Sequence, residues 1–296
     1  MNEQEGITTC NVIGPGRAGS ALARWFVERG LLRLQDVCAG SAASAEAAVG
    51  RIGAGNAVAC IADMQPASVW LVATPDRTID AACAGLAAAQ RIRPGDIVFH
   101  LSGATPAEVL APLRGQGALI ASVHPVKSFP GVPAAAATFA GTWCTLEGDA
   151  AAVAVLAPLF HVLGGRIATV DPSKKRVYHA GAVFACNYLA ALAEAAFACC
   201  EEAGFSRADA QDMLAPIMRE TFDNVLAMGP ARALTGPIAR GDVAVVERQA
   251  QALAALDPPL AALYARLGEV ALRLARRNGT AAGADLDAIE AALRRA

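Results

Sequence analysis

The chain has 296 residues, of which 55% are hydrophobic and only 5% aromatic, and its 25 basic and 27 acidic side chains nearly cancel. This length exceeds one ordinary core and favours two domains, while the aromatic-poor composition is typical of closely packed helices rather than a β-sandwich. Because no long run of Lys or Arg is present, a nucleic-acid partner is excluded and a small-molecule partner is expected.

The cysteine and histidine spacings predict neither a set of disulfide bonds nor a metal site. The eight cysteines are scattered along the chain, and no two of them form a C-x-x-C pair. Their frequency is far lower than in a small secreted protein held together by disulfides, so they are predicted to be buried, reduced thiols of a cytoplasmic protein. The four histidines lack zinc-site spacing. The first residues, MNEQEGITT, are acidic, unlike the basic start of a signal peptide.

The first predicted strand leads into a glycine-rich turn within "TTCNVIGPGRAGSALARWFVERG". An apolar run ending near Ile13 is typical of a buried parallel strand, and three glycines follow it in G-x-G-x-x-G spacing before an apolar helical stripe. Such a turn lets a pyrophosphate approach the backbone and the free N–H groups of a helix. A ligand-free tight turn is the alternative. The candidate cofactor-binding residues are Gly14, Pro15, Gly16, Arg17, Ala18 and Gly19.

The next elements alternate between strands and helices. Strands are predicted at 36–39, 58–63, 68–76, 96–105, 117–125, 141–149 and 166–170, with helices at 78–90 and 151–165. This alternation predicts an α/β domain with a doubly wound, mostly parallel sheet. Beyond Asp171 only helices are predicted, at 177–202, 208–226, 243–256 and 259–278. The expected domains are therefore residues 1–171 and an all-α domain, 172–296.

One helical segment, 179–200, approaches the length of a membrane span. It carries His179, Asn187 and Glu194, and a charged side chain at a bilayer centre costs about 2.5 to 3.5 kcal/mol even on insertion scales. We therefore expect a buried helix of a soluble protein, with no membrane partner.

Ligands of open α/β sheets bind outside the carboxyl ends of the strands. Beside the glycine-rich turn, this rule selects four further loops as cofactor contacts, although each alone could be an ordinary turn. They contain Ser41, Thr74-Pro75-Asp76, Ser102-Gly103 and His124.

The end of the second strand favours NADP over NAD. NAD-binding turns place a carboxylate on the ribose 2′-OH about 20 residues after the glycines, whereas residues 39–43 offer none. NAD stays possible, because the Arg expected beside a 2′-phosphate is missing from this turn and Arg51 lies too far along to assign.

Several motifs carry a resemblance over nearly the whole chain: "GPGRAGSAL", "VATPD", "HLSG", "SVHPVKSFPG", "KRVYHAGAVFACNYL" and "GPIARGD". In this order they resemble the Rossmann-like oxidoreductases that carry the domain of unknown function 2520, relatives of 6-phosphogluconate dehydrogenase, ketopantoate reductase and pyrroline-5-carboxylate reductase. The resemblance implies an NAD(P)-binding Rossmann domain and a helical substrate domain that forms a homodimer. It names a reaction type and not a reactant.

The better-known relatives present a Lys and, four positions later, an Asn to the substrate. Here Lys175 is followed by His179, and the nearest Asn is Asn187. On one continuous helix Lys175 and Asn187 are about 18 Å apart, so they cannot touch the same carbonyl. The expected catalytic residues are His179 as proton donor, Lys175 as charge stabiliser and Asn187 as substrate contact. The alternatives are a core histidine and an interdomain asparagine.

Two further candidates lie outside that helix. "SVHPVKSFPG" resembles the His-Pro turn of prephenate dehydrogenases, which implies that His124 and Lys127 lie near the nicotinamide as cofactor or substrate contacts, with a rigid Pro-rich turn as the alternative. His124 is also the rival of His179 for the role of proton donor. Ser102 resembles a ribose or nicotinamide contact. In "LTGPIARGD", Arg240 is expected to bind a substrate carboxylate, with an exposed pair with Asp242 as the alternative.

The sequence thus predicts an NADP-dependent oxidoreductase acting on a small carboxylate-bearing 2-oxo or hydroxy acid, such as a ketopantoate-like compound, or an imine. The alternative is a sensor that binds NADP(H) without hydride chemistry, which the departure from the Lys-to-Asn spacing keeps open.

Overall fold

The computed structural model describes residues 8–129 and 138–295, which pack as two units divided after Tyr188. The acidic start of the chain (1–7) and Pro130 and Gly131 of the "SVHPVKSFPG" motif lie outside the described residues. This division lies beyond the boundary expected near Asp171-Pro172, and the helix Lys175–Ala185 is grouped with the sheet-containing unit.

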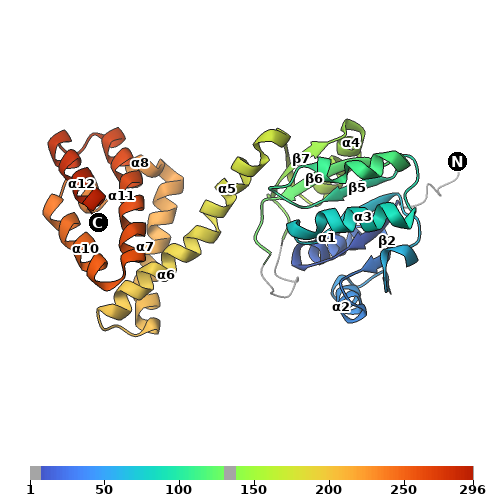
Figure 1. Ribbon diagram of the computed structural model, residues 1–296, viewed down its shortest axis with the longest axis horizontal. Helices are drawn as coiled ribbons and strands as arrows, with labels where there is room; N and C mark the ends of the chain where they lie inside the picture. Colours follow the sequence, from blue (N-terminus) through green and yellow to red (C-terminus); the bar gives the residue numbers. More distant parts are fainter. Residues whose placement is uncertain (1–7, 130–137, 296) are drawn as a thin grey trace. The chain divides into compact units, whose positions relative to one another are not determined.

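The first unit is built on one eight-stranded sheet with the strand order β3-β2-β1-β4-β5-β6-β7-β8. Figure 1 draws the strands of this sheet in blue to green. All neighbouring strands are parallel except β6 and β7. The strands are β1 (Thr9–Ile13), β2 (Arg33–Cys38), β3 (Asn56–Val58), β4 (Val69–Val72), β5 (Ile97–His100), β6 (Leu119–Pro125), β7 (Trp143–Gly148) and β8 (Arg166–Thr169). The predicted doubly wound, mostly parallel sheet is confirmed.

Helices cover both faces of this sheet, which explains why its central strands are apolar throughout. The four residues of β4 are all buried, and alternate ones belong to two separate hydrophobic clusters. One cluster includes Phe26 and Phe160, and the other includes Ile79 and Leu113. The helices are α1 (Arg17–Glu28), α2 (Ala42–Ile52), α3 (Ile79–Ala89), α4 (Ala150–Val162) and α5 (Lys175–Ala185), with 3₁₀ segments at Ile61–Asp63, Asp76–Thr78, Ala107–Gln116 and Pro172–Lys174.

The second unit contains only helices among its described residues. Its core joins α10, α11 and α12 through Val246, Leu272 and Ile289, and Gly268 lets α11 approach Leu293 because a Cβ there would lie 2.6 Å from that side chain. The helices are α6 (Asn187–Glu202), α7 (Arg207–Met228), α8 (Pro230–Ala233), α9 (Pro237–Arg240), α10 (Val243–Leu256), α11 (Pro258–Asn278) and α12 (Gly283–Arg295). The predicted all-α second part is confirmed.

Two local predictions were wrong, and two elements were not predicted. The strand expected at 58–63 ends at Val58, and a 3₁₀ turn replaces its second half. The helix expected over 177–202 begins at Lys175 and is interrupted at Cys186, whose φ and ψ of −123° and −64° are not helical. The 3₁₀ segment Ala107–Gln116, which contains Pro112, and helix α12 were not predicted.

The apolar segment around α5 and α6 is not buried within the chain. Residues 172–202 are long and apolar enough to cross a membrane, and no residue of α6 is buried. The expected buried helix is therefore wrong for a single chain: Val177 is 76% exposed and Phe184 is 68% exposed.

The eight cysteines are all free, but only half are buried. Burial raises the pKa of the Cys10 and Cys144 thiols to about 12, so these two are inert. Cys60, Cys186 and Cys199 are exposed, which departs from the expected burial.

Candidate active site

The three glycines of the first turn differ in how closely other atoms surround them. Gly14 has φ +66°, and a Cβ there would lie 2.2 Å from Thr74 Cγ2; a Cβ on Gly19 would lie 2.4 Å from Ala73 Cβ. Both glycines are thus required for β1, β4 and α1 to pack together. A Cβ on Gly16 would meet nothing within 4 Å, so packing does not explain this glycine.

The space beside Gly16 suits a diphosphate group. Gly16 is the N-cap of α1 and provides no side-chain cap, so the first N–H groups of the helix have no partner from that residue. The buried hydroxyl of Thr74, which contacts Gly14, also has no hydrogen-bond partner in the described structure. Free donors, a helix N-terminus and an open approach to the backbone together fit a dinucleotide's phosphates.

The end of β2 lies directly beside this turn. Gly14 donates its N–H to the Cys38 carbonyl, 2.7 Å away, and Ser41 caps α2 by accepting from the Ser44 N–H at 3.2 Å. Residues 39–43 present no carboxylate here. Arg51, which the sequence did not assign, reaches back from α2 to the turn: its Nη2 lies 3.4 Å from both the Pro15 carbonyl oxygen and Ser20 Oγ.

The loops after β4 and β5 are joined by a short hydrogen bond. Ser102 Oγ donates to Asp76 Oδ2 at 2.6 Å and accepts the N–H groups of Ala104 (3.2 Å) and Thr105 (2.8 Å). The hydroxyl therefore holds its own loop and the neighbouring one. Pro75 is the N-cap of the 3₁₀ turn that contains Asp76.

Two imidazoles converge over Gly103. A Cβ on this glycine would lie 2.4 Å from His179 Nδ1 and 2.8 Å from His124 Nε2, and the two rings are 5.4 Å apart at an interplanar angle of 75°. His179 Nδ1 is buried and has no hydrogen-bond partner among the described residues. The loop after β5, the end of β6 and the first turns of α5 thus bring two titratable nitrogens to one point.

His124 is held from behind by Tyr178 and Thr145. Thr145 Oγ1 donates to the Tyr178 hydroxyl at 3.1 Å, which leaves the tyrosine O–H to donate to His124 Nδ1, 2.9 Å away. This network assigns the proton of a neutral His124 to Nε2. Burial, together with the nearby His179 and Lys175, lowers the pKa of His124 to about 4, so its imidazole is neutral at pH 7.

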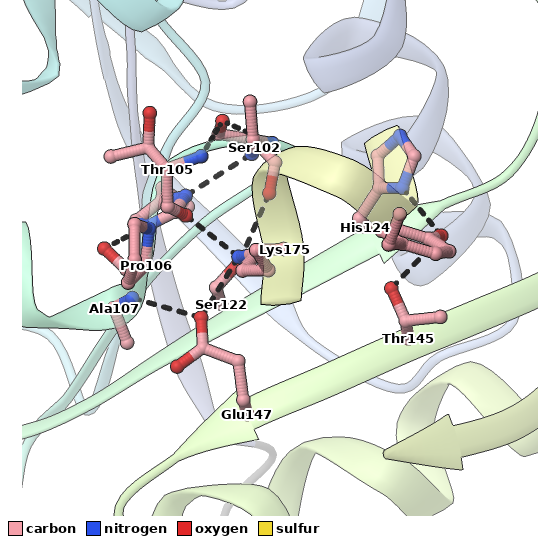
Figure 2. Close-up of polar contacts among 12 residues, drawn as sticks. Ser102, Thr105, Pro106, Ala107, Ser122, His124, Thr145, Glu147 and Lys175 are labelled. Carbon is pink, nitrogen blue, oxygen red and sulfur yellow. Dashed lines mark hydrogen bonds and ion pairs between the residues drawn. The ribbon is translucent and has the colours of Figure 1, made fainter. Parts of the chain in front are cut away.

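Lys175 is buried in a polar cluster at the start of α5. Its Nζ donates to Glu147 Oε1 (2.8 Å), to the Thr105 carbonyl (2.7 Å) and to Ser122 Oγ (Figure 2). The side chain is 0% exposed, and burial lowers its pKa against the opposing effect of Glu147. Because an ammonium has three N–H donors, this Lys retains none for a substrate.

The cluster extends to the loop that holds Ser102. Glu147 Oε1 also accepts the Ala107 N–H at 2.8 Å, and Ser122 Oγ donates to the Ser102 carbonyl at 3.1 Å. His100, fully buried beneath the same loop, accepts the Ser102 N–H on Nδ1, and burial lowers its pKa to about 4. The Lys175 cluster therefore ties α5 to the strands that carry His124 and Gly103.

Three sequence candidates remain: Asn187, Lys127 and Arg240. Asn187 is exposed at the start of α6. Lys127 is half-buried two residues beyond β6 and has no carboxylate partner among the described residues. Arg240 belongs to the second unit, where its guanidinium pairs with Asp242 at 2.8 Å and is 64% exposed.

Sequence reasoning missed Tyr178, Thr145 and Glu147. A carboxylate within the apolar strand "WCTLEG" was a usable signal, since buried charges are almost always paired. Tyr178 stands beside His179 in the quoted motif, but its contact with His124 joins residues 54 positions apart and is visible only in the fold.

Two family models match the chain. A Rossmann-like domain matches residues 3–125, and the domain of unknown function 2520 matches residues 142–271. No curated protein matches.

Solved structures resemble the fold over most of the chain at low identity. A provisionally assigned NADP oxidoreductase of Bacteroides fragilis is 22% identical with a TM-score of 0.74, covering 89% of this chain and 97% of its own. The protein TM1727 of Thermotoga maritima is 24% identical with a TM-score of 0.70, covering 90% and 98%. An imine reductase of Myxococcus stipitatus, in complex with NADP⁺, is 17% identical with a TM-score of 0.57, covering 97% and 93%.

Proposed function

Because the chain belongs to the family that joins a Rossmann-like domain to the domain of unknown function 2520, we propose that it is an NADP-dependent oxidoreductase. It reduces the C=O or C=N bond of a small carboxylate-bearing 2-oxo acid or imine, or oxidises the corresponding product. NAD is the second-choice cofactor.

One observation supports this proposal: the carboxyl edge of the sheet carries an open glycine-rich turn after β1, and the imidazoles of His124, at the end of β6, and His179, on α5, meet beside the loop after β5. Gly16 has free space where a phosphate needs it, and His124 Nε2 and His179 Nδ1 converge on Gly103. In a nicotinamide-dependent reduction the protein has to bind the phosphates of the cofactor and provide a group that transfers a proton. When bound, the reduced nicotinamide supplies the hydride.

The residues around Gly103 divide the remaining work. His179 is the proton donor, since its buried Nδ1 has no hydrogen-bond partner among the described residues. His124, neutral at pH 7 and fixed by Tyr178, directs its Nε2–H toward the same point as a hydrogen-bond donor to the substrate oxygen or nitrogen. Lys175, with all three N–H groups occupied, is a positioning residue for α5.

The carboxylate of the substrate is assigned to Lys127 in preference to Arg240. Lys127 has no acidic partner among the described residues and follows the strand that ends at His124-Pro125. Arg240 is already paired with Asp242. Asn187, exposed at the start of α6, is kept as an additional substrate contact.

We also propose that the working unit is a cytoplasmic homodimer. Exposed apolar side chains lie on α5, among them Val177 and Phe184, and also on α7, among them Ile217 and Leu226. A second copy is a better cover than a bilayer, because α6 and α7 also carry the ion pairs of Arg207 with Glu194 (2.7 Å) and Glu201 (2.6 Å).

The test is NADPH oxidation, followed by absorbance against a panel of 2-oxo acids and cyclic imines. Replacing His179 by Gln is expected to lower kcat by about 10²- to 10⁴-fold while NADPH affinity stays within about threefold. H161Q, which changes an exposed histidine on α4, is the matched control.

Two results would contradict the proposal. A protein that binds NADPH tightly and oxidises it with no member of the panel would be the non-catalytic sensor. Equal losses of affinity and turnover in H179Q would assign His179 to the fold rather than to proton transfer.

A further inference from the structure

Arg51 lies beside the glycine-rich turn but has no role in the function proposed above. It lies near the carboxyl end of α2, eight residues beyond the turn (39–43) in which a 2′-phosphate partner is normally sought. Nevertheless its guanidinium reaches the glycine-rich turn, with Nη2 3.4 Å from the Pro15 carbonyl oxygen and 3.4 Å from Ser20 Oγ. The side chain therefore crosses from one helix to the start of another.

These two contacts use little of the guanidinium. Both are long for hydrogen bonds and both involve Nη2, while Nε and Nη1 have no hydrogen-bond partner among the described residues. No carboxylate lies within 4 Å of Arg51 there either, unlike Arg24 of α1, which pairs with Glu28 at 2.6 Å. A guanidinium held at a ligand-binding turn with free donors is suited to an incoming oxyanion.

The position of this charge relative to β2 indicates which oxyanion it meets. Pro15 follows Gly14, whose N–H is bonded to the Cys38 carbonyl at the end of β2. The ribose 2′ position of a dinucleotide is recognised at the end of this strand, and here residues 39–43 offer small side chains and no carboxylate. Ser41 and Ser44, which lie beside this end, are hydrogen-bonded to each other at 2.9 Å.

We propose that Arg51 binds the 2′-phosphate of NADP(H) and is the residue that selects the phosphorylated dinucleotide over NAD(H). This proposal rests on the proposed function, because it requires a dinucleotide at the glycine-rich turn. In this proposal Arg51, from the carboxyl end of α2, supplies the positive charge that the turn after β2 lacks. The Pro15 and Ser20 contacts hold the guanidinium beside the turn until the phosphate binds.

Binding measurements on the full chain test the assignment without a substrate. The probes are NADPH against NADH, and adenosine 2′,5′-bisphosphate against AMP, titrated by calorimetry. In R51A, affinity for NADPH and for the bisphosphate is expected to fall by about 10- to 100-fold, the range for one lost charge-assisted contact, whereas NADH and AMP change by less than about threefold. R51K should recover part of the loss.

R29A is the matched control, since Arg29 is exposed at the opposite end of α1 and has no carboxylate partner among the residues described. Equal weakening of NADPH and NADH in R51A would make Arg51 a brace for the turn and overturn its role in selectivity. Unchanged binding of both would overturn it as well. A wild-type chain that binds neither dinucleotide would remove the proposed function itself.

Discussion

The buried Lys175–Glu147 pair allows a prediction about the free energy of unfolding that can be tested without a substrate. The two side chains are 0% and 6% exposed, and they connect α5 to β7. Replacing Lys175 by Met removes the three N–H bonds to Glu147, Thr105 and Ser122 and leaves the carboxylate buried with only the Ala107 N–H as partner. Breaking a buried pair in this way costs about 3 to 5 kcal/mol, mostly through the uncompensated charge.

The double variant separates the charge from the packing. In K175M/E147Q the amide oxygen of the glutamine still accepts the Ala107 N–H but carries no charge, so the double variant should be more stable than K175M by at least about 1 kcal/mol. Urea unfolding followed by tryptophan fluorescence is a suitable assay, because Trp25, Trp70 and Trp143 all lie in the first unit.

The exposed pair of Arg24 and Glu28 is the matched control, with an N–O distance of 2.6 Å at i, i+4 spacing. R24M should cost no more than about 0.5 kcal/mol. If K175M cost no more than R24M, or if K175M/E147Q were less stable than K175M, then the free energy of this cluster would not come from a buried charge that needs its partner.

Three further predictions concern the site and its surroundings. G103A should lower kcat by about 100-fold, because its Cβ displaces the His124 and His179 rings, whereas G115A, which meets nothing within 4 Å, should not; equal kcat values would remove Gly103 from the site. Stability should fall as the pH drops from about 6.5 to about 4, because His100 and His124 both take up a proton in the unfolded state before they do so in the folded state. Over this range H100N should lose about 3 kcal/mol less free energy of unfolding than the wild type, measured by urea unfolding at a series of pH values, and an equal loss would assign the pH dependence to other groups. In light scattering, F184E should give monomers and the control V155E dimers; a dimeric F184E would refute the assigned interface.

Part of the candidate site could be predicted from local sequence patterns. The carboxyl-edge rule selected Gly14, Gly103 and His124 from the order of strands, because in a parallel sheet every strand delivers its following loop to the same edge. Helical spacing alone put Lys175 and His179 on one face, but it could not show that Lys175 points into the sheet with all its donors occupied.

What the sequence by itself determined is the architecture: alternating apolar runs and helical segments, glycine spacing and the absence of later strands are local signals, and each acts through backbone geometry over a few residues. Only the tertiary structure decided the partners, because Tyr178 with His124, Glu147 with Lys175 and Arg51 with Pro15 meet across 28 to 54 residues of chain. Burial also depends on the whole fold, which is why an apolar helix expected in a core is exposed in the single chain.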